Sequence, residues 1–163
     1  MHTLVVIKPS ILVFTHDDDY FRWLQDQSQN QESRQAKLML QANTPAAGLL
    51  MLHTDPHILI VVVDQCEDLE RPDYTKLSLI RSIHSVTRRR RPVITVGPFE
   101  PHSFMLGGAT RESTRRLLPT VLAELYSFQY AVWSASLNSS SLVVQKTPTM
   151  PRRGRRRKAT LIC

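Results

Sequence analysis

Three apolar segments of this sequence end in residues that could carry chemistry. Asp64 directly follows the apolar run ILIVVV, Thr15 closes the segment SILVFT and is followed by His16, and Gly97 follows the run PVITV. In a parallel α/β sheet the carboxyl ends of the strands meet at one edge, and function is concentrated there. Asp64 is therefore a candidate site residue. The alternative is that Asp64 is simply a turn residue that faces a helix.

Alternating strand-like and helix-like patterns position these residues. The apolar runs carry no polar alternation, which is typical of strands covered on both faces. The intervening stretches repeat their apolar residues at helical spacing. The segment between residues 97 and 116 should hold one more helix and one more edge strand, although its two prolines and three glycines leave room for little of either. Strands are predicted at 10–15, 37–42, 58–63 and 92–96, and helices over parts of 17–24, 44–53, 73–86 and 118–130.

Length and charge indicate one domain with a basic tail. The chain has 163 residues, 42% of them hydrophobic, and a net charge of +7. Seven basic residues and no acids lie between Lys146 and Cys163, so the remaining 14 basic residues balance the 14 acids. We expect an extension at residues 1–8, an α/β domain at 9–133 and a disordered basic tail at 134–163.

Cysteine usage and the start of the chain favour the interior of a cell. Two cysteines are too few for a disulfide framework, and no charged segment precedes an apolar one at the start. The longest apolar run is far shorter than the roughly 20 residues that cross a bilayer. A cytoplasmic protein is expected, and the basic tail adds a nuclear alternative.

The order of elements, with an acid closing a central strand, resembles the receiver domain of two-component signalling. That resemblance implies a doubly wound, flavodoxin-like sheet of about five parallel strands in the order 2-1-3-4-5, here with a reduced fourth helix. The family holds Mg²⁺ with a pair of acids after the first strand and phosphorylates an Asp after the third. Asp64 matches that phosphoacceptor position. Thr15 and His16 stand at the metal-pair position, and Asp17 and Asp18 follow two residues later.

Two further parts of the receiver machinery are altered. The family places a Thr or Ser after the fourth strand and a Lys after the fifth, because positive charge must offset that of the phosphoryl group. Here Gly97 falls near the hydroxyl position, with Thr95 two residues earlier. No lysine occurs between residues 76 and 146, and Arg111 and Arg115 are poor substitutes. We expect Asp64 to be a relic without phosphotransfer, and no metal or cofactor.

A narrower resemblance is carried by the strings ILVFTHDDD, TPAAGLLMLHTDPHILIVVVD, LIRSIHS and GGATRESTRRLLPTVLAELYSFQY. They are similar to the receiver-like segment at the amino end of the cAMP-specific phosphodiesterases of the eighth class, over roughly residues 9–130. In that family a PAS domain and a metal-dependent hydrolase domain follow. The resemblance implies that the chain is a fragment or truncated product whose parent hydrolyses cAMP, while the six scattered histidines here form no two-metal centre.

Several surface features could have either a functional or a purely structural role. The acids Asp17–Asp19 could form a displaced metal site, although a helix cap is favoured. Four consecutive arginines could dock an acidic partner or simply form a solvated loop: Arg88, Arg89, Arg90 and Arg91. In the tail, RRKAT makes Thr160 a candidate kinase site, and the basic run could bind nucleic acid or direct nuclear import.

The final predicted helix has an apolar stripe that includes Leu118 and Leu122, which we expect to face the sheet. A second, partly exposed apolar face is predicted at Tyr126, Phe128 and Tyr130. Exposed aromatic clusters tend to mark contact surfaces. This face is a candidate docking surface for the other domains of a phosphodiesterase, for a regulatory protein or for a second copy.

The sequence therefore predicts a non-catalytic regulatory module with a degenerate receiver fold, and no catalytic centre in this chain. A response-regulator receiver that accepts a phosphoryl group at Asp64 is the first alternative. A basic-tailed, nucleic-acid-associated protein is the second. Neither a membrane nor nucleic acid is the expected partner.

Overall fold

The computed structural model describes residues 8–30, 38–64, 74–97 and 108–146. The chain divides into two compact units, residues 1–130 and 131–163. The first unit contains all five strands and the candidate site. The described part of the second unit, residues 131–146, is helical. No helix in the described part of the chain is both long enough and apolar enough to cross a membrane.

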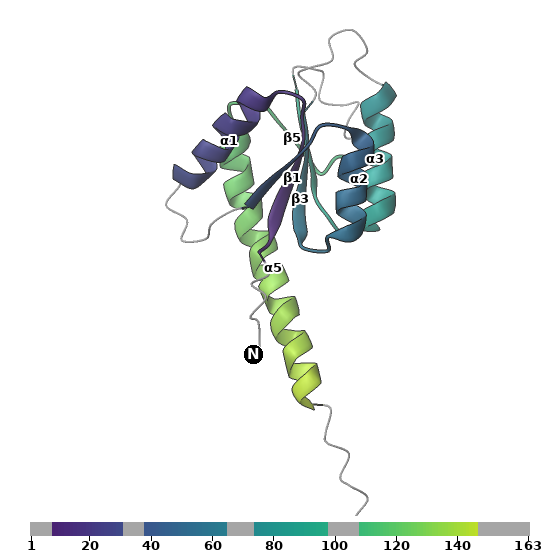
Figure 1. The fold of residues 1–163 in the computed structure, drawn as a ribbon. Coiled ribbons are helices and arrows are strands. Elements are labelled where there is room, and N and C mark those ends of the chain that lie inside the picture. Colours follow the sequence, from purple (N-terminus) through teal and green to yellow (C-terminus); the bar gives the residue numbers. More distant parts are fainter. Residues whose placement is uncertain (1–7, 31–37, 65–73, 98–107, 147–163) are drawn as a thin grey trace, which may run out of the picture. The chain divides into compact units, whose positions relative to one another are not determined.

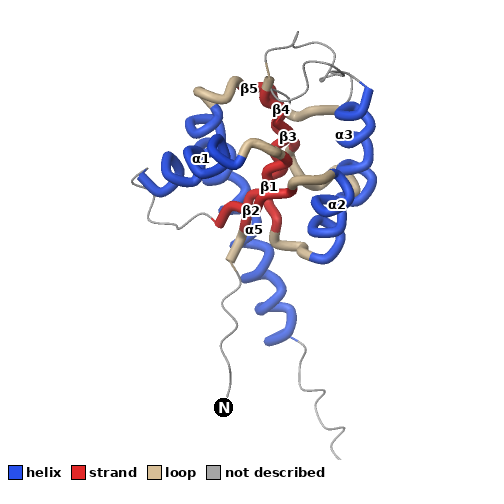
Figure 2. Tube along the Cα trace, turned by 45° about the horizontal axis from the view of Figure 1, so that its top comes forward, coloured by secondary structure: helices blue, strands red, loops and turns tan. Residues whose placement is uncertain are grey.

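The first unit is a parallel five-stranded sheet with helices on both faces (Figures 1 and 2). The strand order β2-β1-β3-β4-β5 is the predicted one, and the fold class is confirmed. Helices α2 and α3 lie together on one face, with α1 and the start of α5 on the other (Figure 1). The elements are β1 (Ser10–Phe14), α1 (Asp18–Asn30), β2 (Leu38–Ala42), α2 (Pro45–Thr54), β3 (Ile58–Asp64), α3 (Tyr74–Thr87), β4 (Val93–Val96), β5 (Arg111–Ser113) and α5 (Leu118–Lys146).

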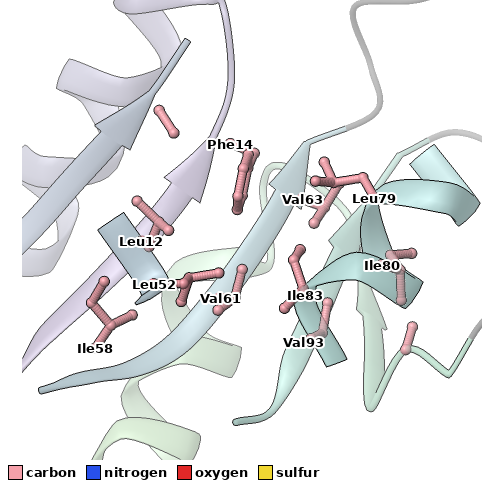
Figure 3. Close-up of a cluster of buried hydrophobic side chains, with 12 residues drawn as sticks. Leu12, Phe14, Leu52, Ile58, Val61, Val63, Leu79, Ile80, Ile83 and Val93 are labelled. Carbon is pink, nitrogen blue, oxygen red and sulfur yellow. The ribbon is translucent and has the colours of Figure 1, made fainter. Parts of the chain in front are cut away.

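Every residue of β1, β3 and β4 is buried, as their continuous apolar sequences predict. One buried cluster packs between the sheet and helices α2 and α3 (Figure 3). Gly48 allows α2 to approach β1, because a Cβ at this position would overlap the ring of Phe14. Side chains alternate along a strand, so the residues between those of this cluster face α1 and α5.

Local signals set the helix ends near the site. Asp17 caps α1 because its Oδ1 accepts a hydrogen bond from the Tyr20 N–H at 2.9 Å. Thr44 caps α2 in the same way, with its Oγ1 3.2 Å from the Ala47 nitrogen, and Pro45 occupies the first turn. These contacts confirm the cap interpretation of Asp17 and the predicted start of α2.

Helix α5 is longer than the sequence indicated. Residues 134–146 were expected to be disordered, and this is wrong, because the helix ends only at Lys146. No glycine or proline occurs between Thr120 and Lys146, and Pro148 disfavours helical geometry at the residue before it. Residues 147–163, the rest of the predicted tail, lie outside the described residues, as does most of the segment in which a reduced fourth helix was expected.

Candidate functional site

The candidate site lies at the carboxyl edge of the sheet, around Asp64. Phe14 and Val63 are paired across β1 and β3, so Thr15 and Asp64 follow them side by side. The Thr15 hydroxyl donates a hydrogen bond to Asp64 Oδ2 at 2.9 Å, and both residues are buried. The same hydroxyl accepts from the Asp17 N–H at 3.2 Å. The predicted metal-pair position therefore supplies a buried hydroxyl donor at Thr15, while His16 is exposed.

Arg115 brings a positive charge to this buried carboxylate. It lies two residues after β5, at the same edge of the sheet. Its Nη2 donates to Asp64 Oδ2 at 2.7 Å, and its Nε lies 3.4 Å from Asp64 Oδ1. Its Nη1 donates to Asp17 Oδ2 at 2.8 Å. One planar guanidinium thus bridges two carboxylates, a geometry that a lysine ammonium does not reproduce.

Tyr20 of α1 holds the guanidinium from a second direction. The Arg115 Cζ lies 4.4 Å from the centre of the Tyr20 ring, within the range of a cation–π interaction. The Tyr20 hydroxyl donates to the Arg115 carbonyl oxygen at 3.2 Å. Trp23 stacks on Tyr20 with ring centres 5.7 Å apart. The side chain and the backbone of Arg115 are therefore both fixed by the first helix.

The pKa of Asp17 is lowered from its ordinary value. The largest cause is the hydrogen bond from the Tyr20 backbone N–H, followed by the hydrogen bond from Arg115. Both contacts favour the charged carboxylate. Asp17 therefore caps the helix and supplies the second anion that Arg115 bridges.

These residues do not fit a magnesium ion. Mg²⁺ requires near-octahedral oxygen ligands, usually from carboxylates and water. Both Asp64 oxygens and one Asp17 oxygen already face the Arg115 guanidinium. Within the described ranges, no group of three His, Cys, Asp or Glu residues could hold a metal ion. The guanidinium occupies the place between the two acids that a cation would need.

Sequence reasoning named both candidate arginines without choosing between them. Arg111 forms a 3.2 Å ion pair with Glu124 on the surface, so Arg115 alone of these two meets Asp64. Thr95 pairs with Val63, which belongs to the α2 and α3 cluster, so its side chain faces away from Asp64. The role of Asp17 as an ion-pair partner was missed, because helix capping already accounted for an acidic residue at this position.

The predicted docking surface on α5 is only partly exposed. Tyr126 is 1% exposed, so its assignment to an exposed face is wrong. It lies four residues beyond Leu122 and eight beyond Leu118, on the helix face that packs toward the sheet. Tyr130 is half-buried, with its ring centre 6.0 Å from that of Tyr126, whereas Phe128 is 65% exposed. Thr160 lies outside the described residues.

Comparisons with known proteins support the fold. No family model and no curated protein matches the chain. A response regulator receiver protein from Pseudomonas putida has a similar structure, with a TM-score of 0.58 and 20% identity over 76% of this chain and 98% of that one. A complex of the P1 domain of CheA3 with CheY6 from R. sphaeroides gives 0.54 and 13%, over 73% and 97%. An adenylate cyclase structure from Rhodopirellula baltica gives 0.58 and 11%, over 86% and 100%. These similarities define a receiver-like fold.

The Arg115–Asp64 pair generates a prediction about stability. Replacing Arg115 by Ala leaves a buried carboxylate without its cation, and should lower the free energy of unfolding by about 3–5 kcal/mol. Arg111→Ala is the matched control, since its exposed pair with Glu124 should contribute at most about 1 kcal/mol. Urea unfolding measures both. Adding Asp64→Asn to Arg115→Ala should recover part of the loss, and equal small effects of the two arginine substitutions would contradict the assignment.

The lowered pKa of Asp17 generates a prediction about pH. Because the folded-state pKa lies below the unfolded one, the stabilisation is complete above the unfolded value of about 3.9 and is lost as pH falls through the folded value. Asp17→Asn keeps a capping side chain but removes the charge. This variant should be less stable at pH 7 and lose less stability on acidification below about pH 4.

The pH experiment compares urea midpoints from pH 7 down to pH 2.5. Asp26→Asn is the control, because Asp26 is exposed on the same helix and forms no ion pair within the described residues. Its profile should follow that of the unmodified protein. Parallel acid profiles for Asp17→Asn and the unmodified protein would show that the charge of Asp17 contributes nothing.

Proposed function

We propose that this chain is a non-catalytic regulatory module, a receiver-like domain that has lost phosphotransfer. The observation that carries the proposal is the bridge from Arg115 to Asp64 and Asp17. Phosphorylation of a carboxylate requires an oxygen that can reach the phosphodonor. The Asp64 side chain is 0% exposed, and both of its oxygens face the guanidinium.

The fixed charge of Arg115 also bears on regulation. A phosphoryl group normally changes the electrostatics of such a site by adding negative charge that nearby groups must offset. Arg115 supplies a cation that stays protonated at physiological pH, because a guanidinium does not titrate there. Its partners are already arranged around that cation, with Tyr20 on one side and the two carboxylates on the other. The proposed module therefore presents one constant surface to a partner.

Acetyl phosphate with Mg²⁺ tests the loss of phosphotransfer. Asp64 should gain no phosphate, because Arg115 covers the carboxylate and the site does not fit the metal. Intact-mass spectrometry before and after hydroxylamine treatment measures an acyl phosphate directly. The Pseudomonas putida receiver, treated with acetyl phosphate and Mg²⁺ in the same way, serves as the comparison protein. A stoichiometric, hydroxylamine-sensitive gain of one phosphate that disappears in Asp64→Asn would instead support the phospho-accepting alternative.

The finer part of the proposal is that this module belongs to a cAMP-specific phosphodiesterase and acts on the neighbouring domains. Its support is the sequence resemblance, carried by the LIRSIHS helix and the GGATRE segment. Catalysis would then lie in another domain, and this one would regulate it by contact. Exposed Phe128 is the retained candidate for that contact.

Sequencing full-length transcripts tests this parentage. We expect a PAS-like reading frame after the present chain, followed by clustered His and Asp metal-binding motifs. If the frame closes at Cys163 in every transcript, or continues into unrelated domains, the phosphodiesterase assignment fails. Neither result alters the acetyl phosphate experiment, so the two parts of the proposal are tested separately.

A further inference from the structure

A second site lies at the opposite edge of the sheet from Asp64. There, a cavity of about 230 Å³ opens between the end of α2 and the end of α3, beside the first residue of β3 and the arginines that precede β4. The two helices lie side by side in Figure 1. Their last turns and the loops that follow them line the cavity. The lining residues combine an apolar floor with a basic rim.

The floor and the rim differ in chemistry. The apolar floor that a ligand can contact consists of Val86, which is 37% exposed, and Leu52, which is 8% exposed, because the lining residue Ile58 is 0% exposed. Arg88 and Arg90 are exposed at the rim, and Arg91 is half-buried. These residues offer an apolar contact on one side of the cavity and several guanidinium donors on the other.

The side chains that line the cavity carry a net positive charge, which is opposed in part by the partial negative charges of the two helix carboxyl ends. Three arginines and one acid, Asp55, line it, which gives a net charge of +2. Asp55 Oδ1 accepts a hydrogen bond from the His57 N–H at 2.8 Å, so this carboxylate is already engaged by backbone. Arg91 Nη2 donates to the Pro56 carbonyl oxygen at 2.7 Å. Within the described residues no acid forms an ion pair with the lining arginines, and burial together with the charge of Arg90 lowers the pKa of Arg91.

The backbone that carries the rim arginines is strained. Arg88 and Arg89 have φ angles of 52° and 56°, in the left-handed region. The Arg89 N–H donates to the His84 carbonyl oxygen at 2.9 Å, closing α3 with a motif that places Arg88 where glycine is preferred. An arginine there costs stability that a glycine would not. The cap therefore fixes the direction in which the chain leaves α3 and carries the next arginines to the cavity.

We propose that this cavity binds a phosphate monoester, with the phosphate on the arginine rim and the organic group on the apolar floor. A phosphate monoester carries about −1.5 to −2 charges at neutral pH, which complements the +2 of the lining. Guanidinium forks match phosphate oxygens in geometry and charge. The small volume suits one such group with a short apolar stem. The proposal does not depend on the state of Asp64, which lies at the other edge of the sheet.

Calorimetric titration of the full chain with phenyl phosphate tests this inference. The unmodified protein should bind phenyl phosphate at least several-fold more tightly than inorganic phosphate, because only the former contacts the floor. Arg88→Gly and Arg90→Ala should each weaken binding by about tenfold, the size expected for a lost charged hydrogen bond. Arg81→Ala is the matched control, since Arg81 is exposed on α3 but does not line the cavity. The basic tail is the same in all variants and therefore cancels in the comparison.

Arg88→Gly separates binding from folding. It removes a rim charge and also relieves the left-handed backbone, so it should raise the melting temperature while weakening the affinity. The inference is overturned if phenyl phosphate fails to bind at millimolar concentration, or if inorganic phosphate binds as tightly. It is also overturned if Arg81→Ala weakens binding as much as the rim substitutions do.

Discussion

The structure depends on the neutralisation of one buried carboxylate. Asp64 ends the central strand with no solvent around its side chain, and an unpaired charge at such a position is costly. Thr15 and Arg115 provide a hydrogen bond and a counter-charge from two other segments of the chain. The site therefore ties β1, β3 and the connection before α5 to a single arrangement. Tyr20 adds α1 to it, because its ring and its hydroxyl both contact Arg115.

The two edges of the sheet have opposite electrostatic character. At the carboxyl edge, two acids share one arginine, so the three side chains together carry a net charge of −1. At the amino edge, the arginines that follow α3 exceed the acids beside them and surround an open cavity. A doubly wound sheet usually concentrates function at its carboxyl edge. Among the described residues, Arg115 fills the space between the two acids at that edge, and the cavity lined by arginines lies at the opposite edge.

The sequence predicted the fold well because its signals are local. The unbroken apolar runs identified the buried strands, and Thr44 with Pro45 located the start of α2. The candidate site was only half predictable. The positions of Asp64 and Thr15 could be predicted because each residue comes at the end of an apolar strand. The cationic partner of Asp64 could not be predicted, because sequence spacing does not show that the Arg115 side chain extends past β4 to reach it. Tyr126 was misplaced because it was grouped with Phe128 and Tyr130, although it continues the line of Leu118 and Leu122 at four-residue spacing. Helix α5 continues past Ser134 because no glycine or proline interrupts it there.

The separation of these partners along the chain affects how the domain forms during synthesis. Arg115 lies 51 residues after Asp64 and 98 residues after Asp17. A nascent chain that has released the first three strands from the ribosome therefore holds an acid at the end of an apolar strand, with its cation still untranslated. Contacts this distant in sequence close late, and an incomplete parallel sheet exposes apolar surface until they do. Premature termination before Arg115 would leave a chain that lacks both the cation of Asp64 and helix α5, which covers one face of the sheet.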